Sequence, residues 1–177
     1  MTKISYCLQV HKNPKQVGRL IKNIYSAEDF YYVNVFGTKL PADIWQKEFK
    51  EFENGNFFTS FRFGGAWGMF PVVNATLNSM EKFSCFDYDY FINLTGSCYP
   101  LKSVDTIKKF LKGSKLAYME EFKLPSEAPK DWGKRGGLDR IRVSYYRNPF
   151  FLLYAILLNK LSRSSEYDRD DLSEYPG

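Results

Sequence analysis

The chain has 177 residues, of which 44% are apolar and 18% aromatic, and 25 Lys and Arg against 20 Asp and Glu give it a net charge of +5. This length suits one domain with or without a tail, and this apolar content excludes a chain that is disordered throughout. The mild positive charge fits an anionic ligand such as a nucleotide diphosphate, or an anionic membrane face, but it also occurs in proteins with neither.

The first third of the chain alternates strand-like and helix-like segments. Residues 4–10 are an apolar run typical of a buried strand. Apolar residues then recur between positions 17 and 24 at the spacing of one helix face, and Pro14 precedes them where a first helical turn accepts a proline. Residues 31–35 predict a second strand, and residues 41–51 predict a second helix.

The alternation continues through the middle of the chain. Residues 57–61 predict a third strand, after which Gly64 and Gly65 interrupt the pattern. A third, amphipathic helix follows, and its apolar face is marked by four residues: Val73, Leu77, Met80 and Phe83.

A further strand and helix follow before residue 120. Residues 90–94 predict a fourth strand that ends at Thr95 and Gly96. Ser103 is a residue type that caps helices, and the apolar residues after it predict a helix over 104–111. Residues 117–119 predict a short fifth strand.

Repeated alternation of strands and helices predicts an α/β fold with a mainly parallel sheet and helices on both faces. In such sheets ligands bind beyond the carboxyl ends of the strands, near the point where the strand order reverses. The loops to examine for a site therefore begin at His11, Phe36, Gly64 and Thr95.

The composition changes after Lys123. A charged loop rich in Pro and Gly leads to the apolar segment Phe150–Leu161, which has basic residues near both ends. A core helix or an interface with a protein partner explains this segment better than a membrane-surface helix, which stays the alternative. We therefore divide the chain into an α/β domain over residues 1–124, a loop and apolar helix that continue it over 125–163, and a polar tail over 164–177.

Cellular location is inferred from the start of the chain and from its cysteines. The apolar run at 4–10 is too short for a secretory leader or a membrane anchor, and charged residues follow it. Cys7, Cys85 and Cys98 are widely spaced and odd in number, which predicts neither a metal site nor a disulfide framework and favours a reducing compartment. We expect a cytoplasmic chain, with peripheral membrane association as the alternative.

Two short motifs bear on ligands. His11 and Lys12 come just before a helix N-terminus, where free N–H groups and the helix dipole favour anions. The acids at 87 and 89 have the Asp-x-Asp pattern that can hold a divalent metal against a diphosphate, but they precede a strand rather than follow one, so we favour a solvated turn. The basic residues are dispersed among acidic ones, which argues against nucleic acid as a partner.

Three phrases occur in the order and spacing of a known family. ISYCLQVHK at residues 4–12 precedes RLI and IY at 19–25. AWG and VVNATL follow within 66–77, and DYFINLTG and YPLK follow within 89–102. Together, over about residues 3–122, these phrases resemble the family of core-2/I-branching β-1,6-N-acetylglucosaminyltransferases and peptide O-xylosyltransferases.

The resemblance implies a GT-A-like, Rossmann-like fold in an inverting glycosyltransferase that needs no metal ion and no cofactor. It implies a UDP-sugar donor of the GlcNAc or xylose type, and a glycan or another hydroxyl compound as acceptor. A carboxylate base would deprotonate the acceptor hydroxyl, which attacks the anomeric carbon while the diphosphate leaves.

The resemblance also implies roles for individual residues. Glu120 or Glu121 would match an acid that contacts the acceptor, as would Arg140 and Arg142. The catalytic base stays unassigned, and Glu120 and Glu121 are the residues to test for that role. The donor would be bound by five residues: Val10, His11, Lys12, Gly96 and Ser97.

The sequence departs from the family pattern in three places. Residues 34–39 lack the family's Asp after the second strand, which lies near the base and ribose, and Cys98 replaces an Asp of the third phrase. We expect the family's catalytic Glu and its diphosphate-binding Arg and Lys to fall beyond residue 177. The alternative function is therefore a truncated or catalytically inactive module that binds nucleotide sugars or a partner.

Golgi relatives carry an N-terminal anchor that we do not find here, which disfavours a Golgi location.

Overall fold

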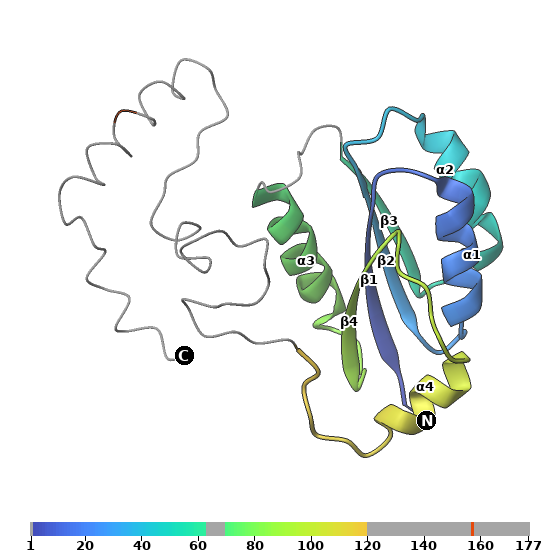
Figure 1. Cartoon of the computed structure of the whole chain (residues 1–177), viewed down its shortest axis with the longest axis vertical. Helices are drawn as coiled ribbons and strands as arrows, with labels where there is room; N and C mark the ends of the chain where they lie inside the picture. Colours follow the sequence, from blue (N-terminus) through green and yellow to red (C-terminus); the bar gives the residue numbers. More distant parts are fainter. Residues whose placement is uncertain (1, 63–69, 120–156, 158–177) are drawn as a thin grey trace. The chain divides into compact units, whose positions relative to one another are not determined.

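The computed structural model describes residues 2–62, 70–119 and 157 (Figure 1). The chain divides into two compact units, Met1–Lys115 and Leu116–Gly177, and nearly all of the described residues belong to the first. The domain boundary expected at residue 124 falls within the second unit, outside the described residues.

The first unit is built on a parallel β-sheet. Its strands are β1 (Ile4–Val10), β2 (Phe30–Phe36), β3 (Phe57–Arg62) and β4 (Tyr90–Thr95). They lie in the order β3-β2-β1-β4, and each neighbouring pair is parallel. Four of the five strands predicted from the sequence are therefore confirmed, each to within a residue at either end.

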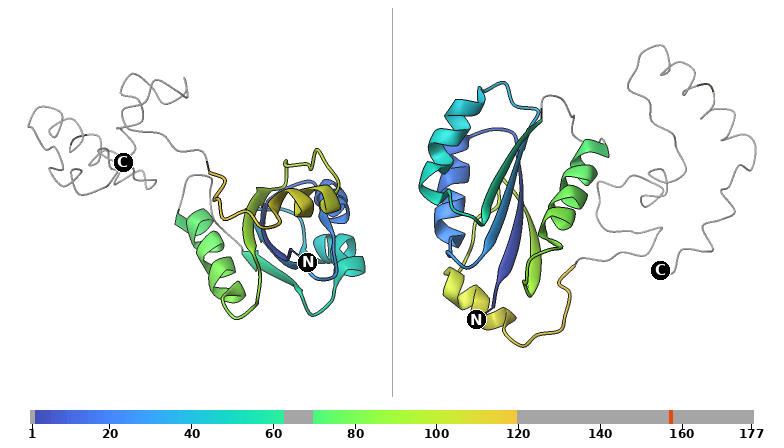
Figure 2. Two further views of the ribbon diagram at one scale, coloured as in Figure 1. Left: turned by 90° about the horizontal axis from the view of Figure 1, so that it is seen from below. Right: turned by 180° about the vertical axis from the view of Figure 1, so that it is seen from behind.

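Helices cover both faces of the sheet, as the alternation of elements predicted (Figure 2). The described helices are α1 (Pro14–Ile24), α2 (Ala42–Phe49), α3 (Phe70–Phe83) and α4 (Val104–Leu111), and a short 3-10 turn, Lys50–Phe52, follows α2. Helices α1 and α2 lie against one face and α3 lies against the other, while α4 packs near the amino ends of the strands on the α1 side (Figures 1 and 2).

The main core lies between the sheet and α1. Alternate side chains of β1, from Ile4 to Val10, are buried there. Helix α1 presents apolar residues at the i, i+3, i+4, i+7 spacing that forms a single face: Val17, Leu20, Ile21 and Ile24. Each such side chain stabilises the fold by about 1.5–3 kcal/mol when it leaves water, which is why α1 is held firmly beside the end of β1.

Helix α3 is oriented differently from what its apolar spacing suggests. An amphipathic pattern ordinarily directs its apolar face to the core. Here Val73, Leu77 and Met80 are 53%, 50% and 43% exposed, and the buried positions are Ala75, Ser79 and Phe83. The helix predicted from the sequence is confirmed, but of the four residues that marked its apolar face only Phe83 is buried.

The cause of this orientation is a polar layer between α3 and the sheet. On β1, the Cys7 thiol donates to Ser79 Oγ at 3.2 Å. On β2, Asn34 Nδ2 donates to the same hydroxyl at 3.0 Å, and Ser79 Oγ donates to the Ala75 carbonyl at 2.8 Å. Because the sheet presents buried polar groups to α3, the helix has to face them with its own polar side chains.

The fifth strand predicted at residues 117–119 is wrong. These residues have no regular secondary structure, and Met119 is 84% exposed. A run of three β-prone residues forms a strand only if a neighbouring strand supplies its hydrogen bonds and burial, because propensity alone contributes little. Among the described residues β4 is an edge strand, and none of the residues 117–119 pairs with it.

Candidate functional site

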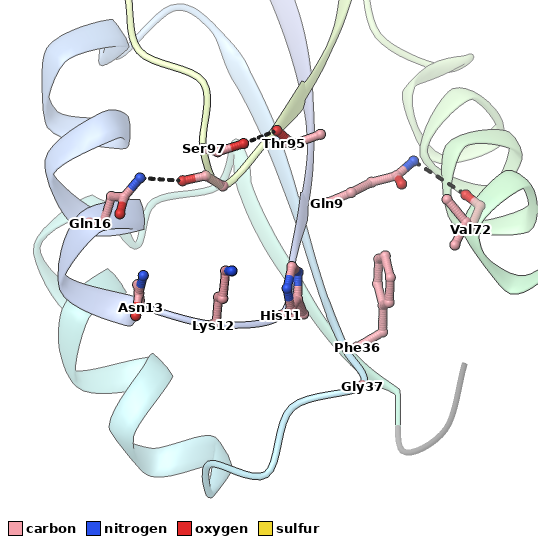
Figure 3. Close-up of a pocket in the computed structure, with 11 residues that line it drawn as sticks. Gln9, His11, Lys12, Asn13, Gln16, Phe36, Gly37, Val72, Thr95 and Ser97 are labelled. Carbon is pink, nitrogen blue, oxygen red and sulfur yellow. Dashed lines mark hydrogen bonds between the residues drawn. The ribbon is translucent and has the colours of Figure 1, made fainter. Parts of the chain in front are cut away.

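A cavity of about 760 Å³ opens at the carboxyl ends of β1, β2 and β4 (Figure 3). This volume is within the range of small-molecule sites. The strand order reverses at β1, whose neighbours are β2 on one side and β4 on the other, so the cavity lies where open α/β sheets bind ligands. Of the four loops singled out from the sequence, those that begin at His11, Phe36 and Thr95 line this cavity, whereas Gly64 lies outside the described residues.

The loop after β1 brings the N-terminus of α1 to the cavity. Asn13 adopts a left-handed conformation with φ 56°, which Asn tolerates better than most residues, and Pro14 then begins the helix. The Asn13 carbonyl accepts from the N–H groups of Gln16 at 2.9 Å and Val17 at 3.2 Å. No side chain caps this helix start, so the positive end of the helix dipole adds to the charge of Lys12, which is exposed and lines the cavity.

The loop after β4 closes another side of the cavity. The Gly96 N–H donates to the Gln9 carbonyl at 3.2 Å, and the Gly96 carbonyl accepts from Gln16 Nε2 at 3.1 Å. A Cβ atom at Gly96 would lie only 3.3 Å from methyl groups of Val10 and Val17. Glycine at this position therefore lets the strand end approach α1 closely, which draws Ser97 to the cavity.

The floor of the cavity rests on a row of polar side chains across the sheet. Gln9 pairs in register with Thr95 on one side and with Asn34 on the other, and Asn34 pairs with Ser60. Gln9 Nε2 donates to α3 at the Val72 carbonyl at 3.2 Å, and Ser60 Oγ donates to Asn34 Oδ1 at 3.1 Å. The first bond fixes the α3 start relative to the end of β1, and the second joins β3 to β2.

The residues implied as donor ligands do not all reach the cavity. His11, Lys12, Gly96 and Ser97 line it. Val10 does not line it, because the whole residue is buried and its side chain packs in the core on the α1 side.

The other lining residues were not identified from the sequence as donor ligands: Gln9, Asn13, Gln16, Phe36, Gly37, Val72 and Thr95. The sequence pattern indicates two of these residues, Gln9 and Gln16, as neighbours of the site. Gln9 shares the alternate face of β1 with Cys7, and Gln16 lies in the first turn of a helix that starts at the site.

Several candidate residues cannot be placed. Glu120, Glu121, Arg140 and Arg142 lie outside the described residues, and so does the segment Phe150–Leu161 apart from Leu157, a helical residue that is 58% exposed. Within the part of the chain that the structure describes, no helix is long and apolar enough to cross a membrane.

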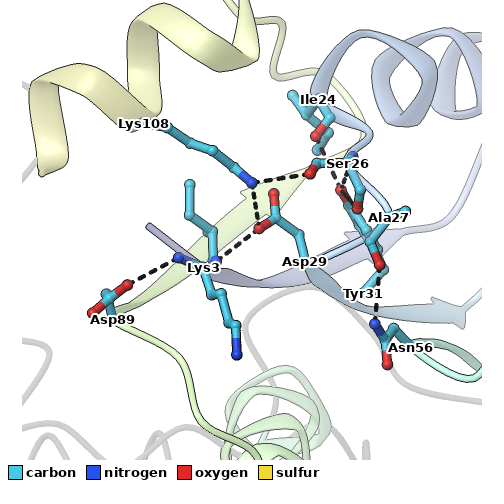
Figure 4. Close-up of polar contacts among 10 residues, drawn as sticks. Lys3, Ile24, Ser26, Ala27, Asp29, Tyr31, Asn56, Asp89 and Lys108 are labelled. Carbon is cyan, nitrogen blue, oxygen red and sulfur yellow. Dashed lines mark hydrogen bonds and ion pairs between the residues drawn. The ribbon is translucent and has the colours of Figure 1, made fainter. Parts of the chain in front are cut away.

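The Asp87-Tyr88-Asp89 motif lies at the opposite edge of the sheet. Asp89 Oδ2 accepts from the Lys3 N–H at 2.9 Å (Figure 4). The Asp87 carboxylate lies 3.5 Å from Lys3 Nζ. Asp89 thus ties the amino ends of β1 and β4 together, and the Asp87 side chain is 98% exposed, as expected of a solvated turn. Across the described ranges, no three His, Cys, Asp or Glu side chains are grouped as metal ligands.

A family model and several curated proteins are similar to this chain in sequence. A family model described as Core-2/I-Branching enzyme matches residues 4–144. The chain is 30% identical to xylosyltransferase 1 of Rattus norvegicus over 115 residues, which cover 62% of this chain and 14% of the relative. It is 28% identical to xylosyltransferase 1 of Homo sapiens over 145 residues, or 78% of this chain and 15% of the relative. With xylosyltransferase 2 of Rattus norvegicus the identity is 27% over 147 residues, or 80% of this chain and 17% of the relative. The chain therefore spans less than a fifth of the length of these relatives.

Proposed function

The chain belongs to the core-2/I-branching enzyme family, and from that membership we propose that it binds the nucleotide-sugar donor of a glycosyltransferase. The proposed reaction transfers a sugar of the GlcNAc or xylose type from a UDP-sugar to a glycan or another hydroxyl acceptor, with inversion and without a metal ion. The observation that carries the proposal is the cavity at the strand switch point, where Lys12 and the start of α1 meet the Gly96–Ser97 loop.

The charge of the cavity suits a diphosphate. Lys12 supplies a full positive charge and the N-terminus of α1 supplies a partial one, and both favour an anion. His11 adds ring nitrogens that can donate to phosphate oxygens. None of the described lining residues is acidic, so no carboxylate among them repels the phosphates.

These groups act on the leaving group of the transfer. As the acceptor oxygen bonds to the anomeric carbon, the bond from that carbon to the diphosphate oxygen breaks, and negative charge develops on UDP. Fixed positive charge beside that oxygen lowers the barrier because it stabilises the transition state more than the ground state. Lys12 and the α1 N-terminus would supply this stabilisation, which is our basis for proposing transfer without a metal.

The proton of the acceptor hydroxyl requires a base. On the resemblance to the family we propose Glu120, Glu121, Arg140 and Arg142 as acceptor-contacting residues. We propose Glu120 or Glu121 as the candidate base because these acids are the ones expected beside the acceptor, not because the family's catalytic Glu matches them. A second candidate function is a module that binds nucleotide sugars without turnover. It is favoured by the absence of an Asp from residues 34–39, the segment after the second strand where the family carries one, because Phe36 and Gly37 of this segment line the cavity.

Titration calorimetry of the 177-residue chain with UDP tests the donor site. We expect Lys12→Ala to weaken UDP binding roughly tenfold or more, since one charge-assisted hydrogen bond contributes about 1.5 kcal/mol or more. Lys15→Ala is the matched control, because Lys15 is exposed three residues further on and does not line the cavity. Equal losses in both variants, or no UDP binding by the parent chain, would contradict the proposal.

Measuring UDP release from UDP-xylose and UDP-GlcNAc with sugar and peptide acceptors, with and without EDTA, separates the two candidate functions. Release that continues in EDTA supports metal-independent transfer. Tight donor binding without release under every condition supports the binding module.

A further inference from the structure

Phe36 occupies the last position of β2, on the cavity side of the sheet. Asn34 points toward α3, where it contacts Ser79, and side chains two apart in a strand share a face. Phe36 therefore points to the same side, and it is half-buried and lines the cavity. Gly37 follows with φ 63°, so the chain turns away and leaves the aromatic ring at the cavity (Figure 3).

The cavity is chemically different at its two sides. Lys12 and Asn13 lie at the α1 side, with the positive end of the helix dipole. Phe36 and Val72 line the side formed by β2 and α3, and Figure 3 shows His11 between Lys12 and Phe36 in this view. A ligand that is anionic at one end and planar and weakly polar at the other matches this division, and a nucleoside diphosphate has this form.

Two polar side chains on the same face of the sheet as Phe36 are already engaged within the protein. Asn34 donates to Ser79 at 3.0 Å and accepts from Ser60 at 3.1 Å. The Gln9 amide nitrogen donates to Val72 and Thr76 of α3. Recognition of one nucleobase against another needs hydrogen-bonding groups directed at the base edge, and among the described residues the Asn34 amide and the Gln9 amide nitrogen are directed at α3 instead.

We propose that Phe36 is the platform on which the nucleobase stacks, and that this site accepts pyrimidine and purine nucleoside diphosphates with little discrimination. The inference rests on the proposed donor function of the cavity. Stacking on an aromatic ring tolerates any base because every base has a π-face. The ring thus supplies affinity for the base without selecting uracil.

The first test compares UDP, CDP, ADP and GDP by titration calorimetry of the parent chain. We expect dissociation constants within about fivefold of one another. Uridine selectivity of a hundredfold or more would overturn the inference, and this arm needs no variant.

The second test changes the ring. Phe36→Leu keeps an apolar side chain without a π-face, and we expect it to weaken all four nucleotides roughly five- to 150-fold, the range measured for loss of one base stack. Phe36→Trp keeps the stack and should restore binding. Unchanged nucleotide affinity in Phe36→Leu would overturn the inference.

Inorganic pyrophosphate separates failure of this inference from failure of the proposed function. Its binding should be unchanged by Phe36→Leu, which also reports that the variant is folded, and reduced by Lys12→Ala. If neither pyrophosphate nor any nucleotide binds the parent chain, the proposed donor site is wrong and the inference falls with it. If pyrophosphate and UDP bind but Phe36→Leu changes neither, the donor site stands and Phe36 is not the platform.

Discussion

At the scale of single residues, Gly96 determines how closely the end of β4 approaches α1. Its φ is in the range open to other residues, so the requirement is steric rather than conformational. A methyl group at Gly96 would be 3.3 Å from both Val10 and Val17, which are themselves fully buried and cannot move freely.

We therefore expect Gly96→Ala to lower the free energy of unfolding by about 1–3 kcal/mol, the usual cost of overpacking a core. Gly55→Ala is the control, since nothing lies within 4 Å of a Cβ atom there. Urea unfolding measures both. In the double variant with Val17→Ala the two losses should be less than additive, and strict additivity would contradict a clash between the two positions.

Asp29 and Lys108 form the second residue-scale feature, a buried ion pair at the amino ends of the strands (Figure 4). Lys108 Nζ lies 2.8 Å from Asp29 Oδ1 and donates to Ser26 Oγ at 3.0 Å, while the Ile4 N–H donates to the same carboxylate at 3.0 Å. The pair joins α4 to β1 and to the start of β2, on the edge of the sheet opposite the cavity.

Asp29→Ala should lower the free energy of unfolding by about 3–5 kcal/mol, because it removes the buried oxygen that accepts from Lys108 Nζ and the Ile4 N–H, an acceptor that protonation of Asp29 leaves in place. Replacing both residues, as Asp29→Leu with Lys108→Met, should cost less than Asp29→Ala alone. Urea unfolding measures the free energy of unfolding of both variants. A double variant that is less stable than Asp29→Ala would contradict this account.

The pH dependence of this pair has a definite sign. Burial raises the pKa of Asp29 above its ordinary 3.8, and this outweighs the lowering by the hydrogen bond and charge of Lys108. The folded chain then holds the proton more tightly than the unfolded chain does, so the contribution of Asp29 to stability is complete below pH 3.8 and is lost as the pH rises through the folded pKa. Relative to Asp29→Asn, the parent should gain stability on acidification across this window. A relative loss would mean that attraction to Lys108 outweighs burial.

At the scale of elements, the apolar period of α3 predicts that the helix exists but not which of its faces packs against the sheet. Apolar spacing correctly predicted a helix, because a 3.6-residue period is a local property. It did not predict which side faces the sheet, because that depends on the side chains opposite, on strands distant in sequence. Cys7 and Asn34 alternate with apolar neighbours on their strands, and only their pairing in one sheet makes a polar surface for Ser79.

Ser79→Ala tests this polar interface. We expect it to lower the free energy of unfolding by about 1–3 kcal/mol, since it removes the hydroxyl that accepts from Cys7 and Asn34 in a buried position. Ser84→Ala is a matched control, because the Ser84 hydroxyl also donates to a backbone carbonyl nearby in sequence but is exposed, and it should cost less than about 0.5 kcal/mol. Guanidinium unfolding of both variants is the measurement, and similar losses in the two would contradict a special role for the buried layer.

At the scale of the whole molecule, the sequence predicted where a site forms better than which side chains make it. Alternating strands and helices predicted a parallel sheet, and a parallel sheet places ligand loops at one edge, so the loops at His11, Phe36 and Thr95 could be foreseen. Val10 lies at the end of β1 beside these loops, but strand alternation directs its side chain into the core.

Contacts between segments distant in the sequence could not be predicted from the sequence alone. The bond from Gln16 on α1 to Gly96 after β4 joins residues 80 apart, and the register of β1 with β4 creates it. Such contacts depend on the assembled sheet, whereas the anion preference of the α1 start is local and was predicted from His11 and Lys12.

The measurement that tests the central claim most directly is a UDP titration of the isotopically labelled chain followed by amide chemical shifts. Binding at the carboxyl edge of the sheet predicts the largest shifts at His11, Lys12, Gly96 and Ser97. Shifts confined to Lys3, Asp89 and Lys108 at the opposite edge, or no shifts at millimolar UDP, would contradict the assignment of this cavity as the donor site.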